Sequence, residues 1–278
     1  ACDSVVWNGT TYDSSGTYYS NIGSNNYSMS FDGIDDYVDL GTNTSFLFQN
    51  SFSFESWVKI PSVLIPTSGN GSIIGGYVNY NILIYAGNAN NGAFYVQLPD
   101  LNPFTPTTVL GSTDLRDGNW HHLAVTYDGT QVVLYVDGLV EDSSNKTGNI
   151  TSQNNPTYPF LIGSANHAGN EDFNGDLSSI ELWSQALTQV EIQQYMSCPP
   201  TGTEAGLVGY WNFEEGTGTT AFDQTSNGND GTINGATYDA NVPPQSCALT
   251  NANGCDSTAT LNLTINPSTT STSTVTEC

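Results

Sequence analysis

Apolar and polar residues alternate along several short stretches of the chain. Between residues 51 and 60, Phe52, Phe54, Val58 and Ile60 fall on one side of an extended strand, because successive side chains of a strand point to opposite faces. The same period of two recurs in three further stretches: 122–128, 131–137 and 258–265. Glycine, asparagine and aspartate separate these stretches, as in turns between half-buried strands. The pattern predicts an all-β chain built as an antiparallel sandwich.

One segment carries a helix start signal instead. Thr188 can cap a helix over residues 189–196, and Glu191, three residues later, completes a capping box. The segment is short, so we expect the helix to pack at the edge of the sandwich.

The charge balance narrows the range of partners. The chain has 278 residues, with 27 acidic and 3 basic side chains and a formal net charge of -24. Nucleic acid is a poor partner, because its phosphates are neutralised by lysine and arginine, and anionic membrane surfaces repel the chain. No stretch has the roughly 20 apolar residues of a transmembrane helix, so we expect no membrane insertion. The excess of carboxylates favours a divalent cation with oxygen ligands, such as calcium.

The cysteines point to an oxidising setting. None of the five stands in a CxxC pair, so a zinc site is not expected. No signal peptide is visible, and we expect a mature secreted fragment in which cysteines form disulfides. Their connectivity cannot be deduced from spacing alone.

The two ends of the chain resemble halves of one unit. CDSVVWNGTTYDSSGTY at 2–18 resembles the first half of a small β repeat that is common in long bacterial surface proteins of the Bacteroidetes type, and TNANGCDSTATLNLTIN at 250–266 resembles its second half. The resemblance implies that 1–22 plus 248–278 form one small, discontinuous Ig-like β domain, and that 23–247 is an insertion. Neighbouring termini make such insertions tolerable.

This resemblance also implies a disulfide pattern. Cys2 would pair with Cys255 inside the split domain, Cys198 with Cys247 at the end of the insertion, and Cys278 with a cysteine of a following unit. Other pairings stay open.

The insertion resembles the laminin-G-like branch of the concanavalin-A-like jelly rolls. The resemblance implies two antiparallel sheets, an extracellular location at the cell surface, and a binding or adhesive role. It rests on five motifs: SFDGIDDYVDLG at 30–41, SFSFESWVKI at 51–60, GNWHHLAVTYDG at 118–129, VVLYVDG at 132–138 and FNGDLSSIELWSQALTQVEI at 173–192.

One part of this pattern is out of order. GLVGYWNFEEGTGTTAFDQTSNGNDGTINGATY at 206–238 resembles the opening strands of the family but comes last, as in a circular permutation. These strands can close their own jelly roll, or they can complete the next unit by donor-strand addition. The second route would build a head-to-tail filament.

Calcium is a recurring ligand in this family, and the resemblance suggests where it could bind. The candidate ligands are acidic residues near turns: Asp32, Asp35, Asp36, Asp176, Glu214 and Asp223. The alternative is that these carboxylates cap turns by bonding to their own backbone. One departure weakens the metal hypothesis, because Ser178 and Ser179 stand where the family often has an acidic residue.

Sugar binding would need aromatic rings beside hydrogen-bonding groups. The best candidates are Tyr77, Tyr80, Tyr85 and Tyr95, although tyrosines also pack with the ring buried and the hydroxyl in water. Three tryptophans are expected in the core: Trp57, Trp120 and Trp211.

Catalysis is not expected. The Glu-x-Asp-x-x-Glu pattern of related glycosidases is missing from the sequence. His121 and His122 fall within the strand motif and are interpreted as structural. The sequence therefore predicts a non-catalytic structural or adhesive repeat unit of a cell-surface adhesin or fibre, with copies of itself as partners. The alternative is a carbohydrate-binding lectin module of a secreted protein, with glycans as partners.

Overall fold

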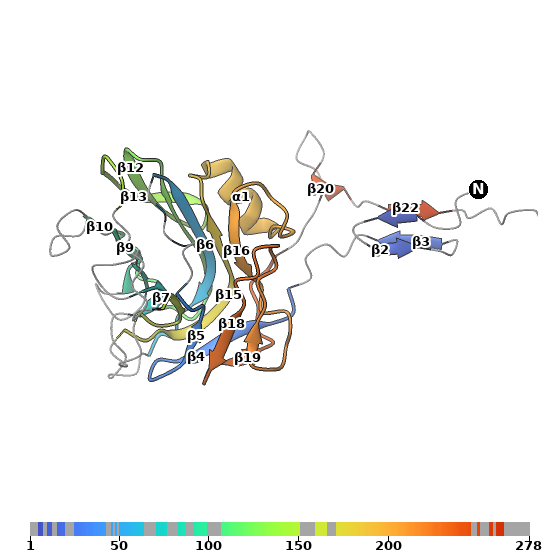
Figure 1. Ribbon diagram of the computed structural model, residues 1–278, viewed down its shortest axis with the longest axis horizontal. Coiled ribbons are helices and arrows are strands. Elements are labelled where there is room, and N and C mark those ends of the chain that lie inside the picture. The colour runs from blue at the N-terminus through green and yellow to red at the C-terminus, as the bar shows by residue number, and fades with distance from the viewer. Residues whose placement is uncertain are drawn as a thin grey trace, which may run out of the picture. The chain divides into compact units, whose positions relative to one another are not determined.

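The chain divides into two compact units. In the computed structural model, residues 1–24 together with 246–278 form the first unit, and residues 25–245 form the second (Figure 1). In the first unit, the structure describes only short strands. The second is described at 25–42, 46, 48, 50–63, 71–76, 83–86, 92–98, 107–150, 159–165 and 171–245.

The first unit joins the two ends of the chain. β1 (Val5–Trp7) and β2 (Thr10–Tyr12) form a hairpin, and β20 (Leu249–Thr250) pairs with β21 (Asp256–Ser257). β3 (Gly16–Tyr19) lies antiparallel to β22 (Thr260–Leu263), which connects the beginning of the chain to its end. The unit limits fall within two residues of the predicted boundaries, and the Ig-like character of the unit stays a prediction.

Over its described residues, the second unit is an antiparallel sandwich with one helix, which confirms the predicted fold class. Its first sheet has eight strands in the order β10 (Thr107–Leu110), β9 (Tyr95–Leu98), β8 (Leu83–Tyr85), β7 (Ser72–Gly75), β14 (Leu161–Ile162), β5 (Tyr37–Asp39), β18 (Gly231–Asn234) and β17 (Thr220–Ala221).

The second sheet carries most of the features discussed below. Its order is β13 (Leu139–Asn145), β12 (Gln131–Val136), β11 (Trp120–Tyr127), β6 (Phe52–Lys59), β15 (Asn174–Trp183), β4 (Ser28–Asp32) and β19 (Thr237–Asp239). β16 (Leu207–Trp211) also pairs with β15.

The out-of-order strands complete their own sandwich. β16 lies antiparallel to β15, β18 to β5 and β19 to β4. Residues 206–238 thus contribute to both sheets of the unit that contains them.

The core lies between the two sheets, but β6 is buried on both faces. Phe52, Phe54 and Val58 face the core as predicted. The residues between them are also buried, although the alternating pattern predicts a half-buried strand. The outer face of β6 is buried because α1 (Gln189–Ser197) and the residues around it pack against this side of the sheet. They form a second hydrophobic cluster. The members of this cluster are Ala124, Tyr135, Trp183, Leu187, Ile192, Leu207 and Tyr210.

The helix begins as the sequence predicts. The Thr188 side chain accepts a hydrogen bond from the Glu191 backbone N–H, and the Glu191 carboxylate accepts one from the Thr188 N–H at 2.7 Å. The capping box over α1 is therefore confirmed. In the part of the chain that the structure describes, no helix is long and apolar enough to cross a membrane.

Candidate functional site

A row of polar side chains crosses the outer face of the second sheet. Lys59 on β6 is paired with Trp120 on β11 and with Asp176 on β15, and Asp176 is paired with Ser30 on β4. Directly opposite residues of neighbouring strands point to the same side of a sheet. The four side chains therefore stand next to one another, and we call them the outer-face row.

A hollow of about 220 Å³ opens along this row. Its lining residues are Ser30, Phe31, Lys59, Pro61, Asn174, Gly175 and Asp176. Lys59 Nζ lies 3.7 Å from Asp176 Oδ2. Burial raises the pKa of Asp176, while a hydrogen bond from Ser30 and the charge of Lys59 act in the opposite direction. The hollow thus offers an ammonium donor, carboxylate and amide acceptors, and a hydroxyl that can do either.

Trp120 marks one end of the row. Its indole Nε1 donates to Asn241 Oδ1 at 3.0 Å, and the side chain is partly exposed. The prediction that Trp120 belongs to the core is therefore wrong: it faces outward at the start of β11. Trp211 lies in the core between the sheets, and Trp57 is buried on the outer face, where Nε1 donates to the Met196 carbonyl.

Three of the predicted metal ligands come together in the turn after β4. Carboxylate oxygens of Asp32, Asp35 and Asp36 lie within 4.8 Å of one another. Asp32 Oδ1 accepts from the Ile34 N–H at 2.8 Å, and Asp36 Oδ2 accepts from the Asp32 N–H at 2.9 Å. Burial raises the pKa of Asp36, and the charges of Asp32 and Asp35 add to the rise, although the Asp32 N–H lowers it. We call these three residues the aspartate turn.

The other three predicted ligands have different partners. Asp176 lies beside Lys59 in the outer-face row. Glu214 accepts from the backbone N–H groups of residues 26 and 27. The Asp223 carboxylate accepts hydrogen bonds from four groups: the backbone N–H of Tyr210, Thr225 and Asn229, and the Thr225 hydroxyl. The structure does not bring these carboxylates to the aspartate turn.

Two residues that the sequence pattern does not single out adjoin the aspartate turn. Asp172 is 2% exposed, and its Oδ2 has no hydrogen-bond partner among the described residues. Burial raises its pKa, a hydrogen bond from Ser164 lowers it, and the charges of Asp32, Asp35 and Asp36 raise it. Asn174 donates from Nδ2 to the Asp32 carbonyl at 3.0 Å, while its buried Oδ1 is also without a described partner.

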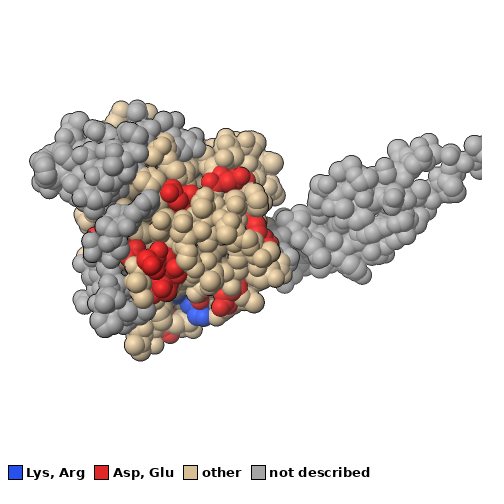
Figure 2. All heavy atoms as spheres, turned by 60° about the horizontal axis from the view of Figure 1, so that its bottom comes forward, with Lys and Arg blue, Asp and Glu red and all other residues tan. Residues whose placement is uncertain are grey.

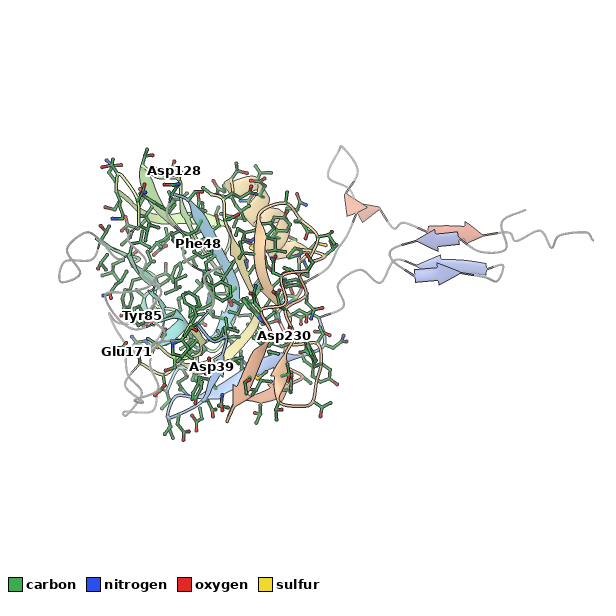
Figure 3. The ribbon with its side chains drawn as sticks, in the orientation of Figure 1. Asp39, Phe48, Tyr85, Asp128, Glu171 and Asp230 are labelled. Carbon is green, nitrogen blue, oxygen red and sulfur yellow. The ribbon has the colours of Figure 1, made fainter. Side chains whose placement is uncertain are left out.

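Two of the predicted sugar-binding tyrosines meet, but both are buried. The rings of Tyr85 and Tyr95 stack with centroids 4.6 Å apart, and the residues are 1% and 4% exposed. Burial raises the pKa of both phenols, and the charge of Glu171, which lies beside Tyr85, adds to the rise (Figure 3). Neither ring presents an open face to a ligand. Tyr77 and Tyr80 lie outside the described residues.

A buried acidic pair lies under α1. Glu181 on β15 is directly opposite Glu55 on β6, and Glu55 Oε2 is 3.5 Å from His122 Nε2. The residues are 1%, 0% and 2% exposed. Burial raises the pKa of both carboxyls and lowers the pKa of His122 to about 3. Paired carboxyls are the machinery of glycosidases, but a substrate cannot reach this pair beneath the helix.

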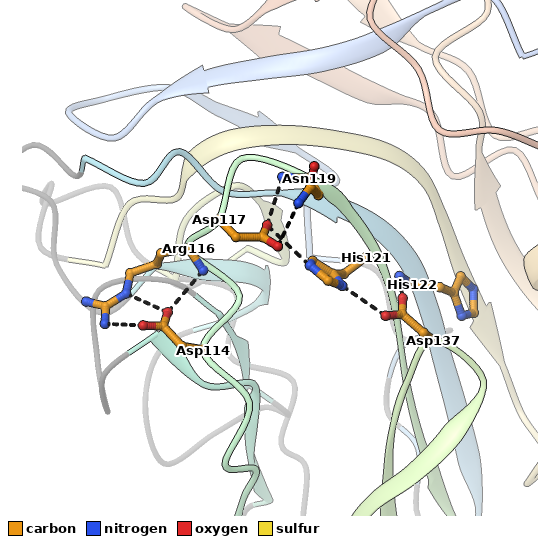
Figure 4. A network of polar contacts seen from close by, with 7 residues as sticks. All are labelled: Asp114, Arg116, Asp117, Asn119, His121, His122 and Asp137. Carbon is orange, nitrogen blue, oxygen red and sulfur yellow. Dashed lines mark hydrogen bonds and ion pairs between the residues drawn. The ribbon is translucent and has the colours of Figure 1, made fainter.

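The neighbouring histidine has a structural role. His121 Nδ1 lies 2.9 Å from Asp137 Oδ2 and Nε2 lies 3.3 Å from Asp117 Oδ1, while Asp137 Oδ1 accepts from the His122 N–H (Figure 4). Burial alone would lower the pKa of His121, but its bonds to Asp137 and Asp117 raise it. The network ties β11 to the β12–β13 turn.

Cys198 is disulfide-bonded in the structure. The other four cysteines lie outside the described residues, so all three predicted pairings stay predictions.

Comparison with known families identifies the second unit. The model of the concanavalin A-like lectin/glucanases superfamily, a laminin G type, matches residues 32–193. The chain belongs to this superfamily. The match ends before 206–238, the strands that come out of order, and it contains the aspartate turn and most of the outer-face row.

Two solved structures and one curated relative are similar to this superfamily member. A Bacteroides ovatus protein provisionally described as carbohydrate-binding has 22% identity and a TM-score of 0.63, over 80% of this chain and 61% of its own. The CBM40 of a Ruminococcus gnavus sialidase, solved with α2,3-sialyllactose, has 14% identity and a TM-score of 0.48, over 62% of this chain and 98% of its own. That likeness is too distant to carry an argument.

Mouse pappalysin-1 is 36% identical over 87 residues, which is 31% of this chain and 5% of pappalysin-1. The chain thus spans a small fraction of this curated relative and about three fifths of the Bacteroides protein.

Proposed function

We propose that residues 25–245 form a non-catalytic carbohydrate-binding module of a secreted protein. The observation that carries the proposal is the outer-face row, where Lys59 and Asp176 line a polar hollow and Trp120 stands opposite Lys59 on the neighbouring strand. Sugar rings pack their apolar faces on aromatic side chains, while their hydroxyls bond to charged and amide groups. The superfamily and the fold likeness to the Bacteroides protein support this function.

The shape of the hollow limits the ligand. Its volume of about 220 Å³ is below the roughly 300–1,000 Å³ of pockets for drug-sized ligands. It therefore suits one sugar unit at the end of a chain or beside Trp120. Figure 2 shows acidic patches on a largely uncharged face, with basic atoms confined to a small spot, and the chain has a formal net charge of -24. Neutral glycans should thus bind more readily than polyanionic ones.

A glycan array followed by isothermal titration calorimetry tests this function. Trp120→Ala and Asp176→Asn should each lower the affinity for the best glycan about tenfold or more, because each removes a contact to the sugar. Phe222→Ala is the matched control for the aromatic change, since Phe222 is 49% exposed and lies outside the row. Binding that both row variants retain would refute the proposed site.

A second candidate role is that of an adhesive repeat unit of a bacterial cell-surface protein. The pairing of β3 with β22 favours it, because one unit then holds both ends of the chain and the jelly roll can be carried in a tandem array. Many weak glycan contacts on one chain would give high avidity. The gene should then continue after Cys278 with another copy of the CDS motif, and a different sequence there would contradict a tandem array.

A further inference from the structure

We propose that helix α1 is a pH-sensitive cover of the second sheet. It stays closed while Glu55 and Glu181 hold their protons, and it opens more often as the pH rises and they can ionise. Opening uncovers an aromatic and acidic face that continues the outer-face row. The proposal does not depend on glycan binding.

The first step of the argument is the place that two carboxyls share beneath the helix. Glu181 on β15 is directly opposite Glu55 on β6, and such neighbours have Cβ atoms about 4.5–5.5 Å apart. Both oxygens of Glu55 and Oε2 of Glu181 have no hydrogen-bond partner among the described residues. Two ionised carboxylates this close repel each other, and burial also deprives them of water. The closed arrangement therefore favours the protonated form of the pair.

The second step is the lack of a compensating positive charge among the described groups that face the pair. His122 on β11 is 2% exposed, and its Nε2 lies 3.5 Å from Glu55 Oε2. Burial lowers the pKa of His122 to about 3, so the imidazole is neutral. Lys59, on the same strand as Glu55, is paired with Asp176. The other titratable groups around the pair are Glu191 and Tyr195 of α1, Tyr210 of β16, Tyr135 of β12, and Glu204.

The third step is how the helix is held. Before α1, the Leu187 N–H donates to Ser53 Oγ on β6 at 2.8 Å, and after it Cys198 is disulfide-bonded. Both ends of the helical segment are thus fixed. Within α1, Ile192 is the one residue that is fully buried. A segment with few buried apolar side chains between fixed ends can open locally while the rest of the fold stays intact.

The face beneath α1 adjoins the outer-face row. Glu55 and Trp57 precede Lys59 on β6 by four and two residues, so the three side chains point to the same side of the sheet. Trp57 Nε1 donates to the Met196 carbonyl of α1 at 3.1 Å. The Trp183 ring lies against Tyr195 of α1, with centroids 4.8 Å apart. Opening separates both tryptophans from the helix and lets water reach the two carboxyls.

Hydrogen exchange of the full chain between about pH 5 and about pH 9 tests the cover. Protection factors are compared, because they remove the intrinsic pH dependence of exchange. The closed form keeps its protons and the open form releases them, so the protection of α1 amides should fall as the pH rises toward the folded-state pKa. The fall should reach about tenfold per pH unit for each carboxyl that ionises on opening. An equal fall in β4 and β9 would mean that the whole sandwich unfolds, and would overturn the proposal.

Variants assign the effect to the pair. Glu181→Gln removes one ionisable carboxyl, and its combination with Glu55→Gln removes both. The pH dependence of α1 protection should weaken in the single variant and disappear in the double variant. If the double variant does not fold, the single variant decides. Asp142→Asn, at an exposed position of β13, is the control and should behave like the wild type. Equal pH dependence in the wild type and Glu181→Gln would refute the role of the pair.

The indole N–H groups report what the opening uncovers. Trp57 and Trp183 lie in contact with α1, whereas Trp211 Nε1 donates to the Asn229 carbonyl in the core. NMR should show that indole exchange of Trp57 and Trp183 becomes faster with pH together with the α1 amides, while Trp211 keeps its protection. If the α1 amides exchange and both of these indoles stay protected, the helix frays without leaving the sheet, and the cover is refuted.

Discussion

Glu181 lies directly opposite Glu55 in the neighbouring strand, and both side chains are buried beneath α1. Other ionisable groups surround them: Glu191 and Tyr195 of α1, Tyr210 of β16, Glu204, and His122 of β11. None of these supplies a positive charge at neutral pH, because burial keeps His122 neutral. We therefore expect the folded protein to hold the two glutamates in protonated form well above the ordinary pKa of glutamate.

The first prediction is that the acid pair makes the protein less stable as the pH rises. The folded-state pKa of Glu55 and Glu181 is raised above the unfolded value. Their contribution to stability is therefore fully present below about pH 4, the unfolded pKa, and is lost as the pH rises through the folded pKa. Carboxylates with a lowered pKa, such as Asp114 and Glu191, make the folded protein more stable as the pH rises. The pH dependence of the wild type alone therefore does not isolate the acid pair, and the test compares the wild type with a variant.

Glu181→Gln removes one of the two titratable carboxyl groups and keeps the shape of the side chain. The variant should be more stable than the wild type at pH 7, by about 1–3 kcal/mol, and the difference should shrink toward pH 4. Urea unfolding at a series of pH values measures it, with Asp142→Asn as the control for loss of an exposed charge. A difference that stays constant with pH would mean that the pair is not protonated in the folded state.

The second prediction concerns the cap of α1. Thr188→Ala removes the side-chain acceptor for the Glu191 N–H and should lower the free energy of unfolding by about 1 kcal/mol. Thr217→Ala, at an exposed turn, is the matched control. Hydrogen exchange in α1 should become faster in Thr188→Ala alone. Equal effects of the two changes would argue against the capping box.

The third prediction concerns Gly235, which packs against the aspartate turn. Its φ of 78° suits glycine, and a Cβ added there would collide with Asp36 Oδ1. Gly118 has a φ of 79° but nothing within 4 Å of such a Cβ. Both Gly→Ala changes should cost about 1 kcal/mol or more from backbone strain. Gly235→Ala should cost more stability in urea unfolding, because its Cβ also has to displace the Asp36 carboxylate, and equal losses in the two variants would contradict this reasoning.

The fourth prediction concerns the disulfides. Peptide mapping of the unreduced protein should recover Cys198 linked to Cys247, and Cys2 linked to Cys255. These linkages follow from the assignment of both chain ends to one small domain. A Cys198–Cys255 peptide would contradict that assignment.

Local signals in the sequence were sufficient to predict the strands, the helix cap and the proximity of the three residues of the aspartate turn. The alternation in β6 and the Thr188–Glu191 spacing each lie within ten residues. The strand and the cap are confirmed, but β6 is buried on both faces rather than half-buried. Asp32, Asp35 and Asp36 are within one turn of one another, so their proximity could be predicted from the sequence.

Long-range pairing could not be predicted in the same way. The Glu55–Glu181 contact depends on the register of β15, which shifts between Ser178 and Ile180, where Ser179 has a φ of 58°. Asn174 contacts the aspartate turn because β15 pairs with β4. The outward position of Trp120 depends on where β11 begins. The candidate site is therefore mostly a product of tertiary structure.

The most direct test of the carbohydrate-binding claim is an NMR titration of the five tryptophan indole N–H signals, with Trp120 assigned by Trp120→Phe. Addition of the best glycan from an array should shift the Trp120 signal, because the sugar contacts the outer-face row. It should leave the signals of buried Trp57 and Trp211 in place. A glycan that binds without shifting Trp120, or the lack of any binding glycan in the presence of calcium, would contradict the account.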